Sequence, residues 1–284
     1  MTGAEPARVA ICVPSFAAER FLAEALDSVL AQTETNWEMV IVDDASLDRS
    51  FEIAQKYADA DPRIVAIRNP ENLGAAASWA AAVAATSAPF VKLLCCDDAI
   101  RPDCLERQLA LFDADSAARL GIVAAQRKLI AEDGSVIRKR HGLMGLKRSA
   151  DTIGHRELVE AMLRTGTNPL GEPSTVMFRR SALEAAGGFD PQWRYVIDLN
   201  AYTEIAKHHQ IALIREPIGV FRVSSTSWSA QLARLQSAET RRLFRQAAND
   251  AGLGRLLLWR GIIAARALQA VRRMVTLTTR SRSR

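Results

Sequence analysis

The chain has 284 residues, 49% of them hydrophobic and 24% charged, a balance typical of a soluble globular protein with one large domain, or one domain and an appendage. The net charge of +5 is uneven, because the eight arginines after Asp250 are accompanied by no acid and the first 250 residues carry −3. This asymmetry argues against a nucleic-acid-binding domain. With no basic head and apolar run near the N-terminus, and no apolar run of about 18 residues, the sequence predicts a cytoplasmic protein without a membrane-spanning helix.

The first 112 residues alternate between short apolar runs and segments in which apolar residues recur at helical spacing. Such alternation predicts an α/β fold with a mostly parallel sheet and helices on both faces. Buried strands are predicted at residues 8–13, 39–42, 64–67 and 90–94, and helices at 21–32, 50–57, 73–85 and 102–112.

Polar residues directly follow each of these four strands. A single cluster of this kind would be ordinary turn chemistry. Because the carboxyl ends of parallel strands meet at one edge of a sheet, where open α/β sheets bind ligands, the clusters together predict one crevice. They are Pro14-Ser15, Asp43-Asp44, Arg68-Asn69 and Asp97-Asp98.

The pattern is less regular from residue 116 onward. An Asp133-Gly134 turn separates two predicted strands, and Gly187-Gly188 is predicted to end a short helix. Helices are predicted to continue from the last strand to the C-terminus. The predicted strands are 122–126, 135–137, 174–178, 211–214 and 219–223, the helices 181–186 and 199–207, and the segment 141–151 is predicted as a loop.

The stretch CCDD at residues 95–98 has three interpretations: a thiolate metal site, a redox pair, or a carboxylate clamp for a different metal. The four cysteines lack the C-x-x-C pairs of a structural zinc site, and no histidine is spaced as a ligand near them. Free cysteine often behaves as a buried hydrophobe, and neighbouring cysteines form a disulfide only with strain. The stretch by itself does not decide between the interpretations.

An ordered set of motifs resembles the family 2 glycosyltransferases, which share the GT-A fold. The resemblance covers residues 9–229, and it implies a GT-A domain at 1–229, with a nucleotide-sugar-binding half at about 1–115 and an acceptor half at about 116–229, followed by a helical region at 230–284. It implies an inverting transfer of a sugar from a nucleotide diphosphate sugar, most often a UDP-sugar, to an acceptor hydroxyl. The motifs are VPSFAAERFLAEALDSVLAQT, VIVDDASLD, NPENLGAAASWAAAV, LLCCDDAIRPD, GEPSTVMFRRSALEAAGGFD and YVIDLNAY.

The resemblance favours the carboxylate clamp. Asp97 and Asp98 would hold Mn²⁺ or Mg²⁺, which prefer oxygen ligands, whereas thiolates suit softer metals. The cation would stabilise the charge that grows on the leaving diphosphate. The family often has a further acid where Cys95 stands, so two carboxylates remain here.

The resemblance also implies a nucleotide site on the first two strands. Pro14, Ser15 and Phe16 would lie along the nucleoside, with Glu19 nearby. Asp44 would accept a hydrogen bond from the base. Asp43 is the adjacent candidate, since pleat alternation sends only one of the two side chains toward the ligand.

The loop after the third strand completes the implied nucleotide site. Asn72 and Gly74 would lie near the base, with Arg68 beside them, and Asp97 would also contact the nucleotide sugar. The alternative for Asn72 is an N-cap on the helix predicted at 73–85. Ser46 and Asp48 are expected to shape the turn before the second helix.

The acceptor half must supply a base for the attacking hydroxyl. By the resemblance Asp198 is that base, and Glu172 is a second candidate near the sugar or the acceptor. His208 and His209 are rivals by pKa. Trp193 and Trp228 either stack on a sugar ring or belong to the core.

Three departures from the family pattern keep a degenerate, non-catalytic binding or scaffold protein as an alternative. They are Cys95, Asn200 in place of a second acid, and Ser224 in place of a histidine. A dinucleotide-dependent oxidoreductase is disfavoured because PSFAAER, not G-x-G-x-x-G, follows the first strand. A sugar nucleotidyltransferase is disfavoured because no glycine-rich triphosphate loop is visible.

The tail from Gly254 to Arg284 is basic and amphipathic. Arg255, Arg266 and Arg273 fall in a narrow sector of a helix. Such a helix predicts either packing on the catalytic domain or a second subunit, or peripheral contact with an anionic membrane at its inner face. Membrane contact would suit a lipid-linked saccharide as acceptor, in the synthesis of bacterial cell-surface polysaccharide or glycolipid.

Overall fold

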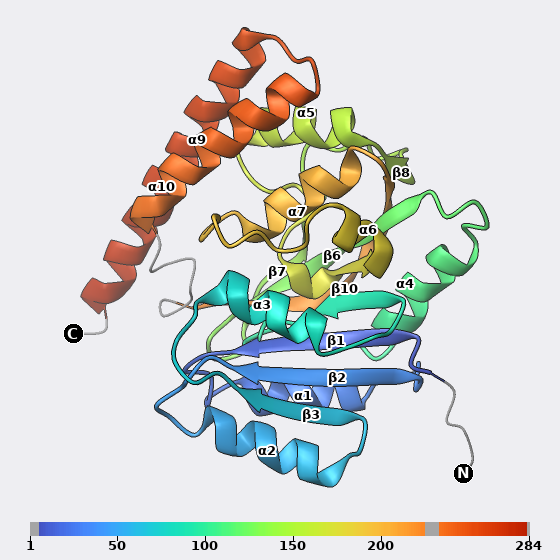
Figure 1. Cartoon of the computed structure of the whole chain (residues 1–284). Helices are drawn as coiled ribbons and strands as arrows, with labels where there is room; N and C mark the ends of the chain where they lie inside the picture. The colour runs from blue at the N-terminus through green and yellow to red at the C-terminus, as the bar shows by residue number, and fades with distance from the viewer. Residues whose placement is uncertain (1–5, 225–232, 283–284) are drawn as a thin grey trace.

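A computed structural model describes residues 6–224 and 233–282, with the backbone alone for 233–235 and 269–282. Within these ranges the strands form one ten-stranded sheet in the order β3-β2-β1-β4-β9-β6-β10-β5, with β7 beside β6 and β8 beside β10 (Figure 1). The strands are β1 (Val9–Ser15), β2 (Trp37–Asp43), β3 (Ile64–Arg68), β4 (Phe90–Leu93), β5 (Ala99–Ile100), β6 (Leu120–Ala131), β7 (Val136–His141), β8 (Thr152–Ile153), β9 (Val176–Arg179) and β10 (Gln210–Val223).

The sheet has two parallel parts. Strands β3, β2, β1 and β4 are parallel to one another, as are β6 and β10, while β9 pairs antiparallel with both β4 and β6 and so joins the parts. The helices are α1 (Leu22–Leu30), α2 (Ser50–Ala60), α3 (Ala75–Ala84), α4 (Cys104–Asp113), α5 (His155–Thr165), η1 (Pro173–Thr175, a 3₁₀ turn), α6 (Arg180–Ala185), α7 (Ile197–Ala206), α9 (Ala233–Asp250) and α10 (Arg255–Arg282).

Helices cover both faces of the sheet, as predicted. Alternate residues of β1 enter different cores: Ile11 and Val13 pack in the core with α1 and α4, whereas Cys12 packs in the core with α3, α6 and α7. Helix α1 packs on the sheet through a single apolar stripe, because its buried residues recur at helical spacing. They are Leu22, Ala25, Leu26 and Val29.

In the second half, one prediction was wrong and one helix was missed. The strands expected at 211–214 and 219–223 are one bent strand, β10, with register shifts on both sides of Pro217. Proline lacks the ladder donor, so the strand bulges there instead of ending. Helix α5 was not predicted, although it buries Leu158 and Met162 at helical spacing and ends at Gly166 with φ +69°.

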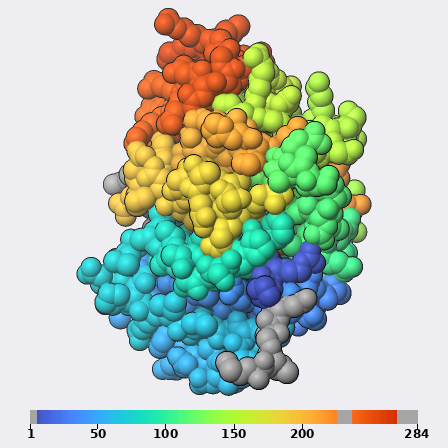
Figure 2. All heavy atoms as spheres, turned by 45° about the vertical axis from the view of Figure 1, so that its right-hand side comes forward, coloured from blue at the N-terminus to red at the C-terminus, as the bar shows by residue number. Residues whose placement is uncertain are grey.

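The C-terminal helices form the end of the molecule opposite α2 (Figures 1 and 2). They share the core that contains α5, since Phe244 of α9 and Ala265 of α10 are buried in it. Their boundary with the predicted GT-A domain, at 229/230, lies outside the described residues. Within those residues no helix combines the length and the hydropathy needed to cross a bilayer.

Candidate active site

The polar clusters after β1, β2 and β3 lie together at the carboxyl edge of the sheet, where the crevice is predicted. Ser15 of β1 lies opposite Asp43 of β2, which lies opposite Arg68 of β3. Beyond the strand ends, Asp44 N–H donates to the Ser15 carbonyl and Asn69 N–H donates to the Asp43 carbonyl, each at 2.8 Å. The sheet therefore holds the polar clusters in register at one edge.

Asp44 organises the loop before α3. Its buried carboxylate accepts hydrogen bonds from Asn69 Nδ2 at 2.7 Å and from the N–H groups of Leu73 and Gly74 at 2.9 Å. Gly74, with φ +85°, is the N-cap of α3, so the alternative N-cap role for Asn72 is wrong. Asn72 is exposed at the edge of this loop. Base recognition by Asp44 and Asn72 stays a prediction.

Two buried polar atoms at this edge have no hydrogen-bond partner among the described residues: Ser15 Oγ and Asp43 Oδ1. Asp43 uses its other oxygen to accept from Ser46 N–H at 3.0 Å and to pair with Arg68 Nε at 3.4 Å. Buried polar groups are almost always satisfied, by protein, water or ligand. The register pair Ser15 and Asp43 therefore fits a polar ligand at the end of β1.

Hydrogen bonds join the loops that follow β1 and β2. Ala17 N–H donates to Ser46 Oγ at 3.1 Å, and Glu19 N–H donates to Asp48 Oδ2 at 3.2 Å. The expected turn-shaping role of Ser46 and Asp48 is confirmed. The carboxylate of Glu19 accepts a hydrogen bond from the Arg49 N–H. Phe16, just after β1, is half exposed.

Asp97 and Asp98 differ in their surroundings. Asp98 is buried, and its two oxygens accept from Ser174 Oγ at 2.5 Å and from Arg222 N–H at 3.1 Å. Asp97 is only half-buried. Burial raises the pKa of both carboxyls, that of Asp98 well above its usual range, where the adjacent Asp97 adds to the effect.

The cysteines of the same stretch stay protonated. Burial raises the pKa of Cys96 to about 12, and it also raises the pKa of Cys95 well above its usual range. Because the thiolate is the form that ligates metals or attacks disulfides, both the thiolate metal site and the redox pair are disfavoured. Cys96 packs against the core on the α4 face, and Cys95 N–H donates to Ser174 Oγ at 3.1 Å.

The donor set fits a divalent cation that is shared with a phosphate ligand. The described residues contain no group of three or more His, Cys, Asp or Glu side chains able to hold a metal alone. Mg²⁺-type cations, however, are commonly held by one or two carboxylates together with substrate phosphates. Asp97 has the exposure that a direct ligand needs, whereas the oxygens of Asp98 already accept hydrogen bonds within the fold.

Asp198 lies in the first turn of α7 and is held by a residue that the sequence analysis missed. Asn168 Nδ2 donates to Asp198 Oδ2 at 2.9 Å and to the Gly171 carbonyl at 2.8 Å. Burial, followed by the charge of Glu172, raises the pKa of Asp198 to about 7. A carboxylate with a pKa near 7 is matched to general-base chemistry at neutral pH. The Asn168-Pro169 pair, a turn signal, was the available clue.

Glu172 interacts electrostatically with both groups of acids. Its charge raises the pKa of Asp97, of Asp98 and of Asp198. It pairs with Arg127 of β6, whose side chain is 5% exposed. Arg127 Nη1 is buried and has no hydrogen-bond partner among the described residues. Nothing in the sequence pattern of β6 marked this arginine as a site residue.

Arg222, near the end of β10, ties the acceptor half to the CCDD loop. Its N–H donates to Asp98, its Nε donates to the Asp97 carbonyl at 3.1 Å, and its Nη2 pairs with Glu24 at 2.5 Å. The guanidinium also lies over the Phe21 ring. Ser224, at the position of the family histidine, donates from Oγ to Glu132 Oε1 at 2.8 Å. Arg222 was missed because its partners are far apart in the sequence.

The remaining predicted residues lie away from this cluster. His208 and His209 follow the C-terminal end of α7, whereas Asp198 is in its first turn. Trp193 is 1% exposed in the core, with Arg242 of α9 over its ring, so its proposed stacking on a sugar is corrected to core packing. Trp228 lies outside the described residues.

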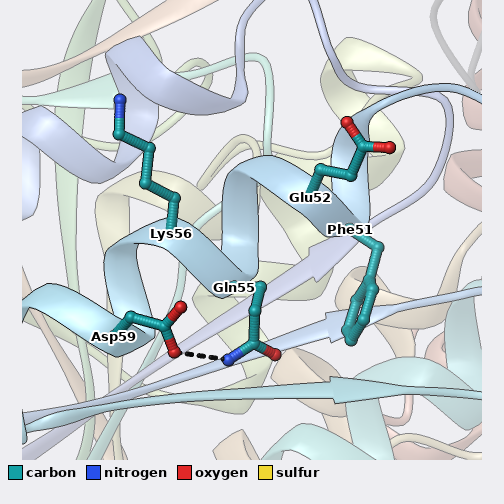
Figure 3. Close-up of a pocket in the computed structure, with 5 residues that line it drawn as sticks. All are labelled: Phe51, Glu52, Gln55, Lys56 and Asp59. Atoms are coloured by element: carbon teal, nitrogen blue, oxygen red, sulfur yellow. Dashed lines mark hydrogen bonds between the residues drawn. The ribbon is translucent and has the colours of Figure 1, made fainter.

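A hollow on the outer face of α2 is distinct from this edge (Figure 3). It has a volume of about 440 Å³, and every lining residue belongs to that one helix. Because side chains of a single helix face diverge, they do not converge on a ligand as those at the strand ends do. The lining residues are Phe51, Glu52, Gln55, Lys56 and Asp59.

Comparison with known proteins identifies one family. Residues 10–187 match Glycosyl transferase family 2. A putative teichuronic acid biosynthesis glycosyltransferase of Bacillus subtilis, TuaG, is 34% identical over 131 residues, which are 46% of this chain and 51% of TuaG. The chain thus spans about half the length of that relative.

Solved structures share the fold at low identity. S. aureus TarS 1-349 in complex with UDP-GlcNAc superposes with a TM-score of 0.69 at 17% identity, over 91% of this chain and 71% of that one. The mannosyltransferase PcManGT of Pyrobaculum calidifontis, in complex with GDP-Man and Mn²⁺, gives a TM-score of 0.61 at 20% identity, over 96% and 81%. The predicted α/β fold of GT-A type is confirmed.

Proposed function

The chain belongs to the family 2 glycosyltransferases, and we propose that it moves a sugar from a nucleotide diphosphate sugar to an acceptor hydroxyl, with inversion at the anomeric carbon. One observation carries the proposal. The segment 168–174 contacts both groups of acids, since Asn168 donates to Asp198 and Ser174 donates to Asp98. The charge of Glu172, between them in the sequence, raises the pKa of Asp97, Asp98 and Asp198, which supports one site with a donor-side acid pair and a candidate base. A sugar held between them would have its leaving group on one side and its attacker on the other.

The donor is proposed to be a UDP-sugar. Its nucleoside would lie along Pro14, Ser15 and Phe16, where Ser15 Oγ and Asp43 Oδ1 have unused hydrogen-bonding capacity. Asp44 would reach the base while still holding the loop before α3. TarS in complex with UDP-GlcNAc supports a uridine donor, and PcManGT in complex with GDP-Man makes guanosine the alternative to test.

The metal is proposed to be Mn²⁺ or Mg²⁺, ligated directly by Asp97. Asp98 would act as a positioning residue, since Ser174 and the Arg222 N–H already hold both of its oxygens. A cation bound there would neutralise charge that develops on the leaving diphosphate. Metal binding requires ionised carboxylates, and burial raises the pKa of Asp97, so metal-dependent donor binding is expected to weaken as pH falls.

Asp198 is proposed as the general base. Its Oδ2 is held by Asn168, which fixes the carboxylate that would take the proton of the acceptor hydroxyl. The pKa of about 7 leaves a large fraction ionised at neutral pH. Glu172, paired with Arg127, would orient the acceptor or the transferred sugar by hydrogen bonds to hydroxyls.

The acceptor is proposed to be a saccharide of bacterial cell-surface polysaccharide or glycolipid synthesis. The name of TuaG, a protein of teichuronic acid biosynthesis, supports this class. The test is a screen of UDP-, GDP- and dTDP-sugars that measures nucleoside diphosphate release with and without Mn²⁺ or Mg²⁺. Metal-stimulated release from one donor is expected. No turnover with any donor, despite donor binding, would instead favour a non-catalytic binding protein.

A further inference from the structure

Helix α10 uses one face to pack on the catalytic domain. Gly261, Ile262 and Ala265 are buried against α5. A side-chain carbon at Gly261 would lie 2.9 Å from the Leu163 Cα, so glycine permits this close approach. The packing alternative predicted for the tail therefore holds for this face, and it leaves the opposite face of the helix to be explained.

The opposite face carries an exposed apolar stripe. Leu256 is 77% exposed, Trp259 57% and Ile263 61%. At 100° per residue these three side chains fall within a sector of about 60°. Single exposed apolar residues are unremarkable, but three that include a tryptophan, aligned on one helix face, mark an interaction surface.

Arginines border this stripe on both sides. By the same helical spacing, Arg255 and Arg266 lie beside Trp259, and Arg260 lies on the far side of Leu256. All three arginines are exposed. Long arginine side chains can extend from an apolar surface while their charged ends stay in a polar layer.

The charge of the C-terminal helices favours one kind of partner. Residues 233–282 contain eleven arginines, no lysine and two acids, Glu239 and Asp250, a net charge of +9. The whole chain carries +5, so the remainder carries −4. A second copy would bring an equal positive charge to the same surface, which disfavours self-association through this face. An anionic lipid surface is complementary in both charge and polarity.

We propose that the outer face of α10 docks on an anionic lipid bilayer, with the helix axis parallel to the surface. The stripe of Leu256, Trp259 and Ile263 would enter the boundary between head groups and acyl chains, and the bordering arginines would contact lipid phosphates. The C-terminal end of α10 lies on the same side of the molecule as the carboxyl ends of β1 and β2 in Figure 1.

The test is sedimentation of the full chain with vesicles of phosphatidylcholine, with or without phosphatidylglycerol. Binding is expected only with the anionic lipid, and it should weaken as salt rises. Replacing Arg255, Arg260 and Arg266 together by Gln should lower the partition coefficient by on the order of a hundredfold, since each arginine contributes about fivefold. The control, Lys56→Gln with Arg119→Gln, changes exposed charges elsewhere and should have little effect.

Two variants separate insertion from mere charge attraction. Trp259→Ser with Ile263→Ser should weaken binding by on the order of tenfold or more, whereas Val65→Ser, at a half-exposed position on the edge strand β3, should not. Trp259→Phe should keep binding but lose most of the fluorescence quenching by brominated lipid. Circular dichroism melts of each variant should match the unsubstituted protein.

Three results would overturn the proposal. They are equal sedimentation with neutral and anionic vesicles, equal sedimentation of the unsubstituted protein and the three-arginine variant, or a concentration-dependent dimer that the Trp259 and Ile263 changes abolish without vesicle binding. The last result would identify a second copy as the occupant. None of these readouts depends on glycosyl transfer, so failure of this proposal is distinct from failure of the proposed function.

Discussion

The nucleotide half and the acceptor half of the site are built in different ways. In the nucleotide half, each polar cluster directly follows a strand of a parallel set, so the sheet register alone brings Ser15, Asp43 and Arg68 together. In the acceptor half, Asp198 and Glu172 come from a helix and a loop and are held by polar contacts across the chain. The first half depends on backbone topology, the second on individual side chains, and we expect substitutions to act differently in the two.

The largest effect is expected at Asp198. Asp198→Asn retains the shape and the contact with Asn168 but removes the proton acceptor, so turnover should fall by roughly a hundredfold or more. Donor affinity, a property of the other half, should be unchanged in a calorimetric titration. His208→Asn is the control, because His208 lies past the other end of α7. Equal loss from both variants, or loss from the control alone, would show that the base is misassigned.

The next effect is expected at the two adjacent aspartates, and it should separate them. Asp97→Asn should weaken metal-dependent donor binding by about tenfold or more with an unchanged melting temperature, because Asp97 is half-buried and holds little of the fold. Asp98→Ala should weaken donor binding and also cost about 1–3 kcal/mol of stability, because it leaves Ser174 and the Arg222 N–H without an acceptor. Destabilisation by Asp97→Asn with a neutral Asp98→Ala would reverse the proposed roles.

The difference between the two halves also explains which features could be predicted from the sequence and which could not. The strands and helices of the first 112 residues follow periodicity and strong turn signals, and the crevice follows from parallel topology. The resemblance identified the family and the fold correctly. For Trp193 the sequence left sugar stacking and core packing open, because a tryptophan in a loop-like segment gives no sign that α9 covers it, and the structure supports core packing.

Other residues were missed because their partners are distant in the sequence. Arg222 contacts Asp98 and Glu24, which lie 124 and 198 residues away, and only the sheet order brings these segments together. Arg127 sits in an ordinary-looking strand, and its importance comes from Glu172 on a separate loop. The bend of β10 at Pro217 was read as two strands because a local pattern cannot show that pairing with β6 continues past it.

A smaller effect concerns pH. The ionised fraction of Asp198 rises with pH through about 7, so kcat/KM should rise with pH and level off above that value. Glu172→Gln removes a nearby negative charge and should move this midpoint to lower pH. The effect of Asp198 on the pH dependence of stability is opposite to that of a salt-bridged carboxylate. Its pKa is raised in the folded state, so between its unfolded pKa and about 7 the folded state holds a proton that the unfolded state has released. The contribution of Asp198 to the free energy of unfolding therefore falls as pH rises toward about 7. A flat pH profile, or an upward shift in Glu172→Gln, would contradict the assignment.

The smallest effect on turnover is expected from substitution of Asn168, and this substitution tests most directly how side chains of the acceptor half act on Asp198. The Asn168 amide stabilises the ionised form of Asp198, lowering its pKa against the effect of burial, and its Oδ1 accepts from the Leu170 and Gly171 N–H groups. Asn168→Ala should therefore raise the pH midpoint, the opposite of Glu172→Gln, and reduce turnover at neutral pH several-fold, the scale of about 1 kcal/mol for one lost hydrogen bond.

The matched control for Asn168→Ala is Asn36→Ala, a partly exposed asparagine just before β2 that should leave the midpoint unchanged. If Asn168 served only to fold its loop, the variant would lose stability and activity with the midpoint fixed. Opposite shifts in the Asn168 and Glu172 variants would instead mean that individual side chains set the protonation of the base. The edge formed by β1 and β2 would then supply only the donor site, because its geometry follows from strand register and is independent of either side chain.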